Sequence, residues 1–180
     1  IIALDFILLI LLVILDQFTK NLAVTRLKER EPFSLLDEVF ELHYLENHGA
    51  AFGLLQNQKW FFVIVGIAFV IIAAFALIYI PTMKKYHGLR ACILLIATGA
   101  IGNMIDRIAF TVPYLGTAFC PNGQPGVVDW INFFGVWAFN FNIADAAIVI
   151  GVILLVIWLI IEEVRDSKKA KNVELAKDAA

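Results

Sequence analysis

Four long apolar runs dominate the hydrophobic pattern of the chain, at about residues 2–22, 60–80, 89–110 and 140–161. Each is close to the roughly 20 residues that an α-helix needs to cross about 30 Å of hydrocarbon. Backbone N–H and C=O groups in lipid must be hydrogen-bonded within their own segment, so the pattern predicts four transmembrane helices. Pro81 follows the most uniform run and predicts its end, because proline has no N–H with which to continue a helix.

The connection from residue 26 to 59 has a different period. Phe40, Leu42 and Tyr44 alternate with polar residues, as they would in a strand with one covered face. We therefore expect a small β element in this connection, lying on the membrane surface. The second long connection, residues 111–139, carries proline and glycine turn signals and is expected to be a loop.

Composition strengthens the membrane interpretation. Hydrophobic residues fill 61% of the 180 positions and charged residues 17%, which is more apolar surface than a water-soluble domain of this size can bury. A net charge of −2 without a basic stripe argues against nucleic-acid binding. The predicted fold is a single membrane-embedded domain over residues 1–180, all-α apart from the small β element, with a polar tail from residue 162 onward.

Basic residues indicate how the helices are oriented. Lys and Arg flank the short connection 81–90 and recur through the tail 162–180, whereas the connection 111–139 contains neither. Cytoplasmic connections of membrane proteins are enriched in Lys and Arg, so both chain ends are expected in the cytoplasm. This orientation places the connection 26–59 outside. That connection holds both basic and acidic residues, so its charges do not indicate an orientation.

Polar and ionisable residues gather at one depth, near the predicted outer boundary. An ionisable side chain in or beside lipid is costly, so each is a candidate for function. Asp16 and Lys20 are four positions apart and share one helical face. The full set is Asp16, Lys20, Asn103, Asp106, Arg107, Asp129, Asn142 and Asp145.

Asp129 and Asp145 suit acid–base chemistry on an amide bond. One carboxylate, ionised, can take a proton from water while the other, protonated, donates to the carbonyl oxygen, and their proximity itself separates the two titrations. We expect Asp129 on a loop and Asp145 fixed at the start of a helix. An alternative is that Asp145 only caps its helix, and Arg107 can equally be a side chain that extends to the membrane surface.

Five short segments together resemble the family of lipoprotein signal peptidases, also called signal peptidase II, which are bacterial membrane aspartic proteases. The resemblance covers nearly the whole chain, and the segments occur in the order that the family shows. They are Asp16–Lys20, Asn47–Gly53, Gly99–Arg107, Val127–Trp130 and Phe141–Asp145.

This resemblance implies hydrolysis of the signal peptide from a diacylglyceryl-modified prolipoprotein, immediately before the lipidated cysteine, with Asp129 and Asp145 as the catalytic pair. It implies a place in the bacterial cytoplasmic (inner) membrane with the active site at the extracytoplasmic face, inhibition by globomycin-type peptides, and no cofactor or metal. We expect a monomer. Substrate-binding or supporting roles fall to Asp16, Lys20, Asn47, Gly49, Asn103, Asp106, Arg107 and Asn142.

Two features depart from the family pattern. The 22 residues between Asp106 and Asp129 form a longer stretch than expected and predict an insertion over residues 111–128, which includes Cys120. Trp130 stands where Phe is common, and a larger aromatic ring suits a membrane interface.

Two other classes of function stay open from the residues alone. A small membrane carrier or channel also holds intramembrane carboxylates, but its polar face should run through the whole bilayer, and the inner halves of the second and fourth runs are almost purely apolar. A non-enzymatic assembly factor should tolerate the loss of either carboxylate. A metal site at His43 and His48 is disfavoured, because their spacing matches no zinc motif.

Overall fold

The structure is a computed structural model that describes residues 1–49, 58–109, 126–133 and 139–178. It contains helices and strands in the order α1 (Ile2–Leu27), β1 (Phe33–Leu36), β2 (Phe40–Asn47), α2 (Lys59–Tyr79), α3 (His87–Ala109), β3 (Val127–Asn132) and α4 (Ile143–Asp178), with a short 3₁₀ turn at Lys84–Tyr86. All four α-helices are long and apolar enough to cross a membrane. The predicted fold class, four transmembrane helices with a small β element, is therefore confirmed.

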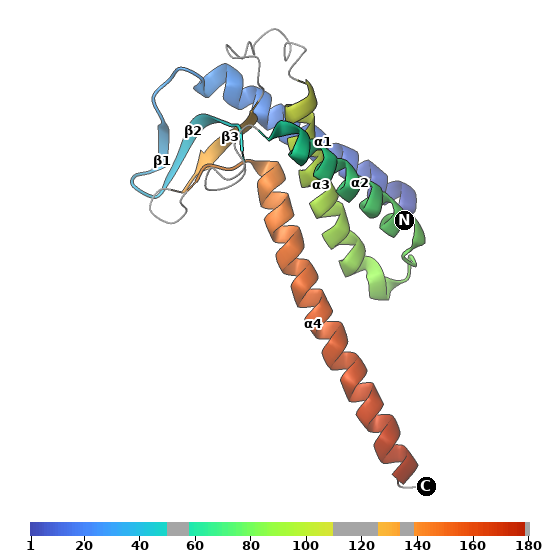
Figure 1. Cartoon of the computed structure of the whole chain (residues 1–180). Coiled ribbons are helices and arrows are strands. Elements are labelled where there is room, and N and C mark those ends of the chain that lie inside the picture. The colour runs from blue at the N-terminus through green and yellow to red at the C-terminus, as the bar shows by residue number, and fades with distance from the viewer. Residues whose placement is uncertain (50–57, 110–125, 134–138, 179–180) are drawn as a thin grey trace.

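The helix α3 is the centre of the bundle. It contacts α1, α2 and α4, and it is the most enclosed of the four spans. Figure 1 shows α4 diverging from the other helices and extending well beyond them. This helix continues without a break through the predicted tail, because the residues after Ile161 include good helix formers and spaced ion pairs such as Arg165–Glu162 at 2.7 Å.

Glycines allow α3 and α4 to approach their neighbours. A Cβ on Gly102 would lie 2.5 Å from Asp16 Oδ2, and a Cβ on Gly151 would lie 2.8 Å from Ile96 Cγ1. Helices in lipid associate through close van der Waals packing over small residues, since the lipid tails are themselves apolar. Gly102 thereby brings a carboxylate of α1 against α3, at the end of the bundle that carries the sheet.

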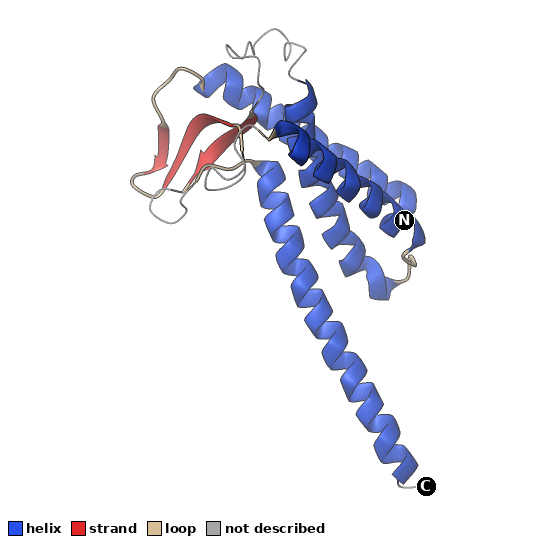
Figure 2. Ribbon diagram, viewed as in Figure 1, coloured by secondary structure: helices blue, strands red, loops and turns tan. Residues whose placement is uncertain are grey.

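The sheet has the order β1-β2-β3 with both pairs antiparallel, and it lies beside one end of the helices (Figure 2). In the β2–β3 ladder, Leu45 is opposite Asp129. Phe141, just before α4, forms a bridge with Ile131 of β3. The strand β3 and the start of α4 are consequently joined by main-chain hydrogen bonds.

The prediction that residues 111–139 form a loop is wrong for Val127–Asn132, and Asp129 lies on a strand rather than on a loop. The alternation signal fails here because Val127, Val128 and Asp129 are all buried, so neither face of the strand is marked by polarity. Residues 50–57 and 110–125, which include Cys120 and most of the predicted insertion, lie outside the described residues.

A buried ion pair joins the helices at the end of the bundle away from the sheet. The Arg90 guanidinium on α3 bonds to Asp5 on α1, with Nε 2.9 Å from Asp5 Oδ2. Its Nη1 also donates to the carbonyl oxygen of Ile80 at 2.7 Å, which satisfies an acceptor left free at the end of α2. Asp5 and Arg90 therefore tie three helices together at this end.

Candidate active site

Asp145 lies in the first turn of α4, where it forms a reciprocal cap with Asn142. The backbone N–H of Asp145 donates to Asn142 Oδ1 at 3.0 Å, and the N–H of Asn142 donates to Asp145 Oδ2 at 3.2 Å. This arrangement satisfies N–H groups that a helix start leaves free. The cap does not use the whole carboxylate, because Asp145 Oδ1 accepts a separate bond of 2.6 Å from the side-chain amide of Asn103.

Asp129 is 1% exposed, and both of its oxygens accept hydrogen bonds from asparagine amides. Asn47 Nδ2 donates to Oδ2 at 3.0 Å, and Asn142 Nδ2 donates to Oδ1 at 2.7 Å. Asn142 thus donates to both aspartates, with its side chain to Asp129 and with its main chain to Asp145. One residue brings together two carboxylates from a strand and from a helix.

The environment of Asp129 favours its protonated form. Burial raises the pKa of Asp129 to about 7, and the negative charge of Asp145 adds to this effect. The amides of Asn47 and Asn142 and the ammonium of Lys20 act in the opposite direction. A carboxyl group with a pKa near neutrality can accept or donate a proton at little cost, which is what acid–base catalysis requires.

Arg107 holds the turn after β2 against α3. Its Nη2 donates to the carbonyl oxygen of Gly49 at 3.1 Å, and its Nη1 donates to that of Asn103 at 3.2 Å. The guanidinium also lies 4.7 Å from the centroid of the Phe62 ring. Gly49 in turn donates its N–H to Asn47 Oδ1 at 3.0 Å. Arg107 therefore supports the main chain beside Asn47 and Asn103, two of the three asparagines that hold the aspartates.

Asp16 and Lys20, which the sequence places on one helical face, form a buried ion pair, and Asp106 joins it. Lys20 Nζ lies 2.9 Å from a carboxylate oxygen of each aspartate, and it also donates to Asn103 Oδ1 at 3.0 Å. Gln17 was not among the predicted site residues, but its Nε2 donates to both carboxylates at 3.1 Å. Its position inside the matching segment Asp16–Lys20 was the available signal.

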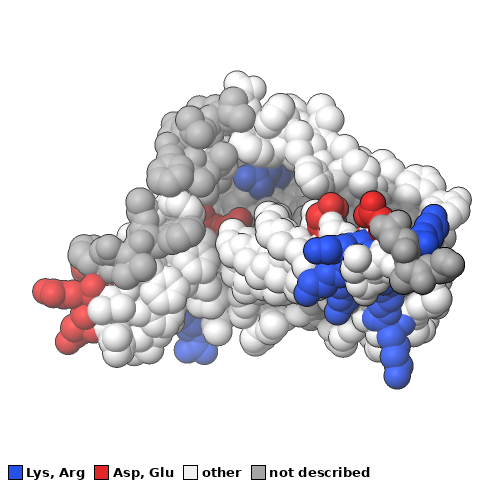
Figure 3. All heavy atoms as spheres, turned by 90° about the horizontal axis from the view of Figure 1, so that it is seen from below, with Lys and Arg blue, Asp and Glu red and all other residues white. Residues whose placement is uncertain are grey.

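Two apolar grooves meet at Asp145. The aromatic groove is a cavity of about 260 Å³, lined by Phe133, Phe139, Phe141, Asp145, Ala146, Val149 and Ile150. The inter-helix groove, about 480 Å³, lies among α2, α3 and α4; on α4 it is lined by Asp145, Ile148, Val152 and Leu155. At a rise of 1.5 Å per residue, the inter-helix groove therefore extends about 15 Å along α4, from Asp145 to Leu155. Figure 3 shows a hollow in the face seen from below, with charged atoms inside it and white atoms around it.

The structure brings all the sequence-predicted site residues to the sheet end of the bundle, in two connected networks. One contains the pair of aspartates with its three asparagines, and the other contains Asp16, Lys20 and Asp106. Among the described residues, no group of three or more His, Cys, Asp or Glu side chains is arranged to hold a metal ion.

Comparisons with known proteins agree with this geometry. The family model described as signal peptidase (SPase) II matches residues 8–161. The lipoprotein signal peptidase of Clostridioides difficile (strain 630) is 39% identical over 155 residues, which cover 86% of this chain and 93% of that protein. The lipoprotein signal peptidase of Symbiobacterium thermophilum is 37% identical over 163 residues, covering 89% and 96%.

A solved bacterial membrane enzyme, determined by the in meso method at 2.3 Å resolution, has the same fold. It superposes with a TM-score of 0.72 and 29% identity, covering 89% of this chain and 90% of that one. A second such structure, at 1.9 Å resolution, gives a TM-score of 0.68 and 31% identity over 87% and 92%. With its four apolar helices, the chain is a multi-pass membrane protein. It belongs to the signal peptidase II family.

Proposed function

We propose that this chain, as a single peptidase domain, removes signal peptides from diacylglyceryl-modified prolipoproteins, with Asp129 and Asp145 as its catalytic pair. The observation that carries this assignment is the position of Asn142, which donates one N–H group to each carboxylate. The two aspartates come from elements far apart in the sequence, and helix capping explains only the contacts of Asp145. The bond cleaved is the amide immediately before the lipidated cysteine.

In this mechanism the pair shares one proton at neutral pH, since burial and the Asp145 charge raise the pKa of Asp129 to about 7. The ionised carboxylate takes a proton from water as that water attacks the scissile carbonyl carbon, and the protonated carboxyl donates to the carbonyl oxygen. When the tetrahedral gem-diol intermediate collapses, the carboxyl that took the water proton passes it to the departing cysteine nitrogen as the C–N bond breaks. One hydroxyl of the intermediate returns its proton to the other carboxylate as the carbonyl re-forms. The pair then holds one proton again, ready for another cycle.

The grooves suit the two apolar parts of this substrate. The apolar segment of a signal peptide precedes the scissile bond and the acyl chains follow it, so the catalytic pair should lie where two apolar sites meet. Asp145 lines both grooves. We assign the signal-peptide segment to the inter-helix groove, which follows α4 along the membrane span, and the acyl chains to the aromatic groove.

We place the enzyme in the bacterial cytoplasmic (inner) membrane as a monomer, with both chain ends inside and the catalytic pair at the extracytoplasmic face. This orientation is supported by Lys84 and Lys85, which lie between α2 and α3 at the end opposite the sheet. Globomycin-type peptides are expected to compete with the substrate for this site.

The catalytic pair can be tested with purified Asp129→Asn and Asp145→Asn variants and a diacylglyceryl-modified prolipoprotein, with cleavage followed by gel mobility. Each variant should fold and lose activity by about 10³-fold or more, because the shared proton or its acceptor is removed. Asp166→Asn, on the exposed end of α4, is the matched control and should cleave normally.

Chelators should leave the wild-type rate unchanged, because the mechanism uses only side chains and water. Turnover within tenfold of wild type by either dyad variant would reject the pair. Cleavage by wild type but not by the variants would at the same time exclude a carrier and a non-enzymatic assembly factor.

A further inference from the structure

Three buried charges lie behind the catalytic pair. Asp16, Lys20 and Asp106 are 0%, 1% and 1% exposed, and the single ammonium lies 2.9 Å from each carboxylate. Removing charges from water is costly, and well-packed apolar residues often stabilise a protein as well as a buried ion pair does. Stability alone is therefore a weak explanation for this cluster.

The carboxylates of the cluster accept hydrogen bonds from two particular peptide groups. Ala144, the residue immediately before the catalytic aspartate of α4, donates its N–H to Asp16 Oδ1 at 2.9 Å. Val128, the residue immediately before the catalytic aspartate of β3, donates its N–H to Asp106 Oδ2 at 3.2 Å. Each carboxylate thus fixes the main chain from which one catalytic side chain projects.

Lys20 and Gln17 connect these two supports. Lys20 bridges the carboxylates of Asp16 and Asp106 and also donates to Asn103, whose amide holds the catalytic carboxylate of α4. Gln17 Nε2 donates to Asp16 Oδ2 and Asp106 Oδ1, both at 3.1 Å. A shift of one support is therefore transmitted to the other through buried, charge-assisted hydrogen bonds.

We propose that Asp16, Lys20 and Asp106 are positioning residues that set the relative placement of the two catalytic aspartates. Asp16 acts through Ala144, Asp106 acts through Val128, and Lys20 joins the two. This role rests on the proposed function, because it presupposes that Asp129 and Asp145 are the catalytic pair. A misplacement of about 1 Å can lower a rate by about 10²-fold, so a rigid link between the two supports has a direct catalytic effect.

The chain offers a matched control at the other end of the same helices. Asp5 of α1 is buried and paired with Arg90 of α3. Asp5→Ala therefore removes a buried carboxylate between the same two helices, at the end away from the sheet. A loss of stability without a loss of positioning is the expected consequence.

The test compares Asp16→Ala and Asp106→Ala with Asp5→Ala in the purified full-length chain, by measuring kcat, KM and thermal unfolding. We expect all three to unfold at lower temperature. The two cluster variants should lower kcat by about 30- to 100-fold with KM changed by less than about threefold, whereas Asp5→Ala should keep kcat within about twofold. Asp16→Asn and Asp106→Asn retain an oxygen for the main-chain N–H and should lower kcat only about three- to tenfold.

A pH profile of Lys20→Met provides a second readout. The charged groups that interact with Lys20 are Asp16 from its own helix, Asp106 from α3, Asp129 from β3 and Asp145 from α4. Burial and Asp145 raise the pKa of Asp129, whereas the Lys20 ammonium lowers it. Loss of the ammonium should therefore move the alkaline limb of kcat/KM to higher pH, and Asp5→Asn should leave that limb in place.

The positioning role is wrong if Asp16→Ala and Asp106→Ala lose thermal stability as Asp5→Ala does but keep kcat within threefold of wild type. If the alanine variants fail to fold, Asp16→Asn and Asp106→Asn provide the test. Values of kcat equal to that of Asp5→Asn would overturn the positioning role. Either result leaves the proposed function intact, because that function fails only if the Asp129→Asn or Asp145→Asn variant retains turnover.

Discussion

Asn142 shows how a single residue can organise the site, because it caps α4 and donates to both aspartates. Its place three positions before Asp145 was readable from the sequence as a shared helical face. The hydrogen bond from its side chain to Asp129 could not be predicted from the sequence, because it depends on β3 lying beside the start of α4. The motif resemblance predicted a supporting role for Asn142, and the structure supplies the bonds through which that role would act.

The titration of Asp129 leads to a prediction for stability. The carboxyl has an ordinary pKa of 3.8, and burial raises it to about 7 in the folded protein. Between these values the folded protein binds a proton that the unfolded chain lacks, so stability should fall as the pH rises, levelling off above about pH 8. From pH 5 to pH 7 the loss is about 2 kcal/mol at most.

Thermal unfolding of wild type and Asp129→Asn, measured in detergent at pH 5 and pH 8, checks this expectation. The variant cannot titrate at this position, so it should lose less stability than wild type between the two pH values. Parallel pH dependences of the two proteins would show that Asp129 is not strongly shifted.

Among the elements, β3 is the one that sequence patterns could not predict. Its neighbours in the ladder are on β2, where Leu45 faces Asp129, more than 80 residues earlier in the chain. Strand propensity depends on such partners more than on local sequence. The strand restrains Asp129 more tightly than the predicted loop would, through β2 on one side and Phe141 on the other.

The assignment of the aromatic groove to acyl chains can be tested on α4. Val149→Trp places a large side chain in this groove, whereas Val156→Trp adds the same side chain at an exposed position of the same helix that lines neither groove. Overpacking costs about 1–3 kcal/mol. We therefore expect KM for a diacylglyceryl substrate to rise about tenfold or more for Val149→Trp and to stay unchanged for Val156→Trp.

Substrates with long and short acyl chains provide the internal control for this groove. The effect of Val149→Trp should shrink when the chains are short, because less of the lipid then needs the occupied space. An effect of equal size for both substrates would assign the groove to another part of the substrate.

At the scale of the whole molecule, the spans were predictable because lipid sets both their length and their polarity. The residue at which α4 ends could not be predicted in this way, because the membrane does not limit the length of a polar helix that continues into water. The packing of α3 against its neighbours also lay beyond the sequence analysis, since it depends on contacts such as Gly102 with Asp16. These contacts decide where the buried charges meet.

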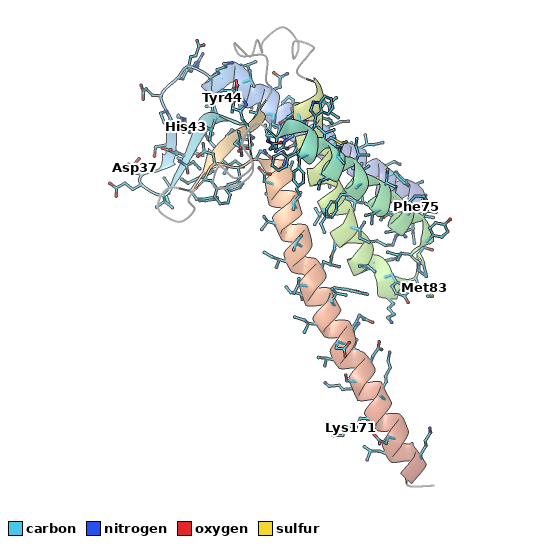
Figure 4. The ribbon with its side chains drawn as sticks, in the orientation of Figure 1. Asp37, His43, Tyr44, Phe75, Met83 and Lys171 are labelled. Carbon is cyan, nitrogen blue, oxygen red and sulfur yellow. The ribbon has the colours of Figure 1, made fainter. Side chains whose placement is uncertain are left out.

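The orientation of the molecule gives the last prediction, for which Asp37 and Lys171 are suitable reporters because both are exposed and lie in different parts of the chain (Figure 4). In a chain with Cys92 and Cys120 replaced by Ser, Asp37→Cys should react with a membrane-impermeant maleimide on intact spheroplasts. Lys171→Cys should react only after permeabilisation, because the basic tail is expected inside. The reverse pattern would place Asp129 and Asp145 at the cytoplasmic face. Labelling of both cysteines on intact spheroplasts would contradict three membrane crossings, by α2, α3 and α4, between the two reporters.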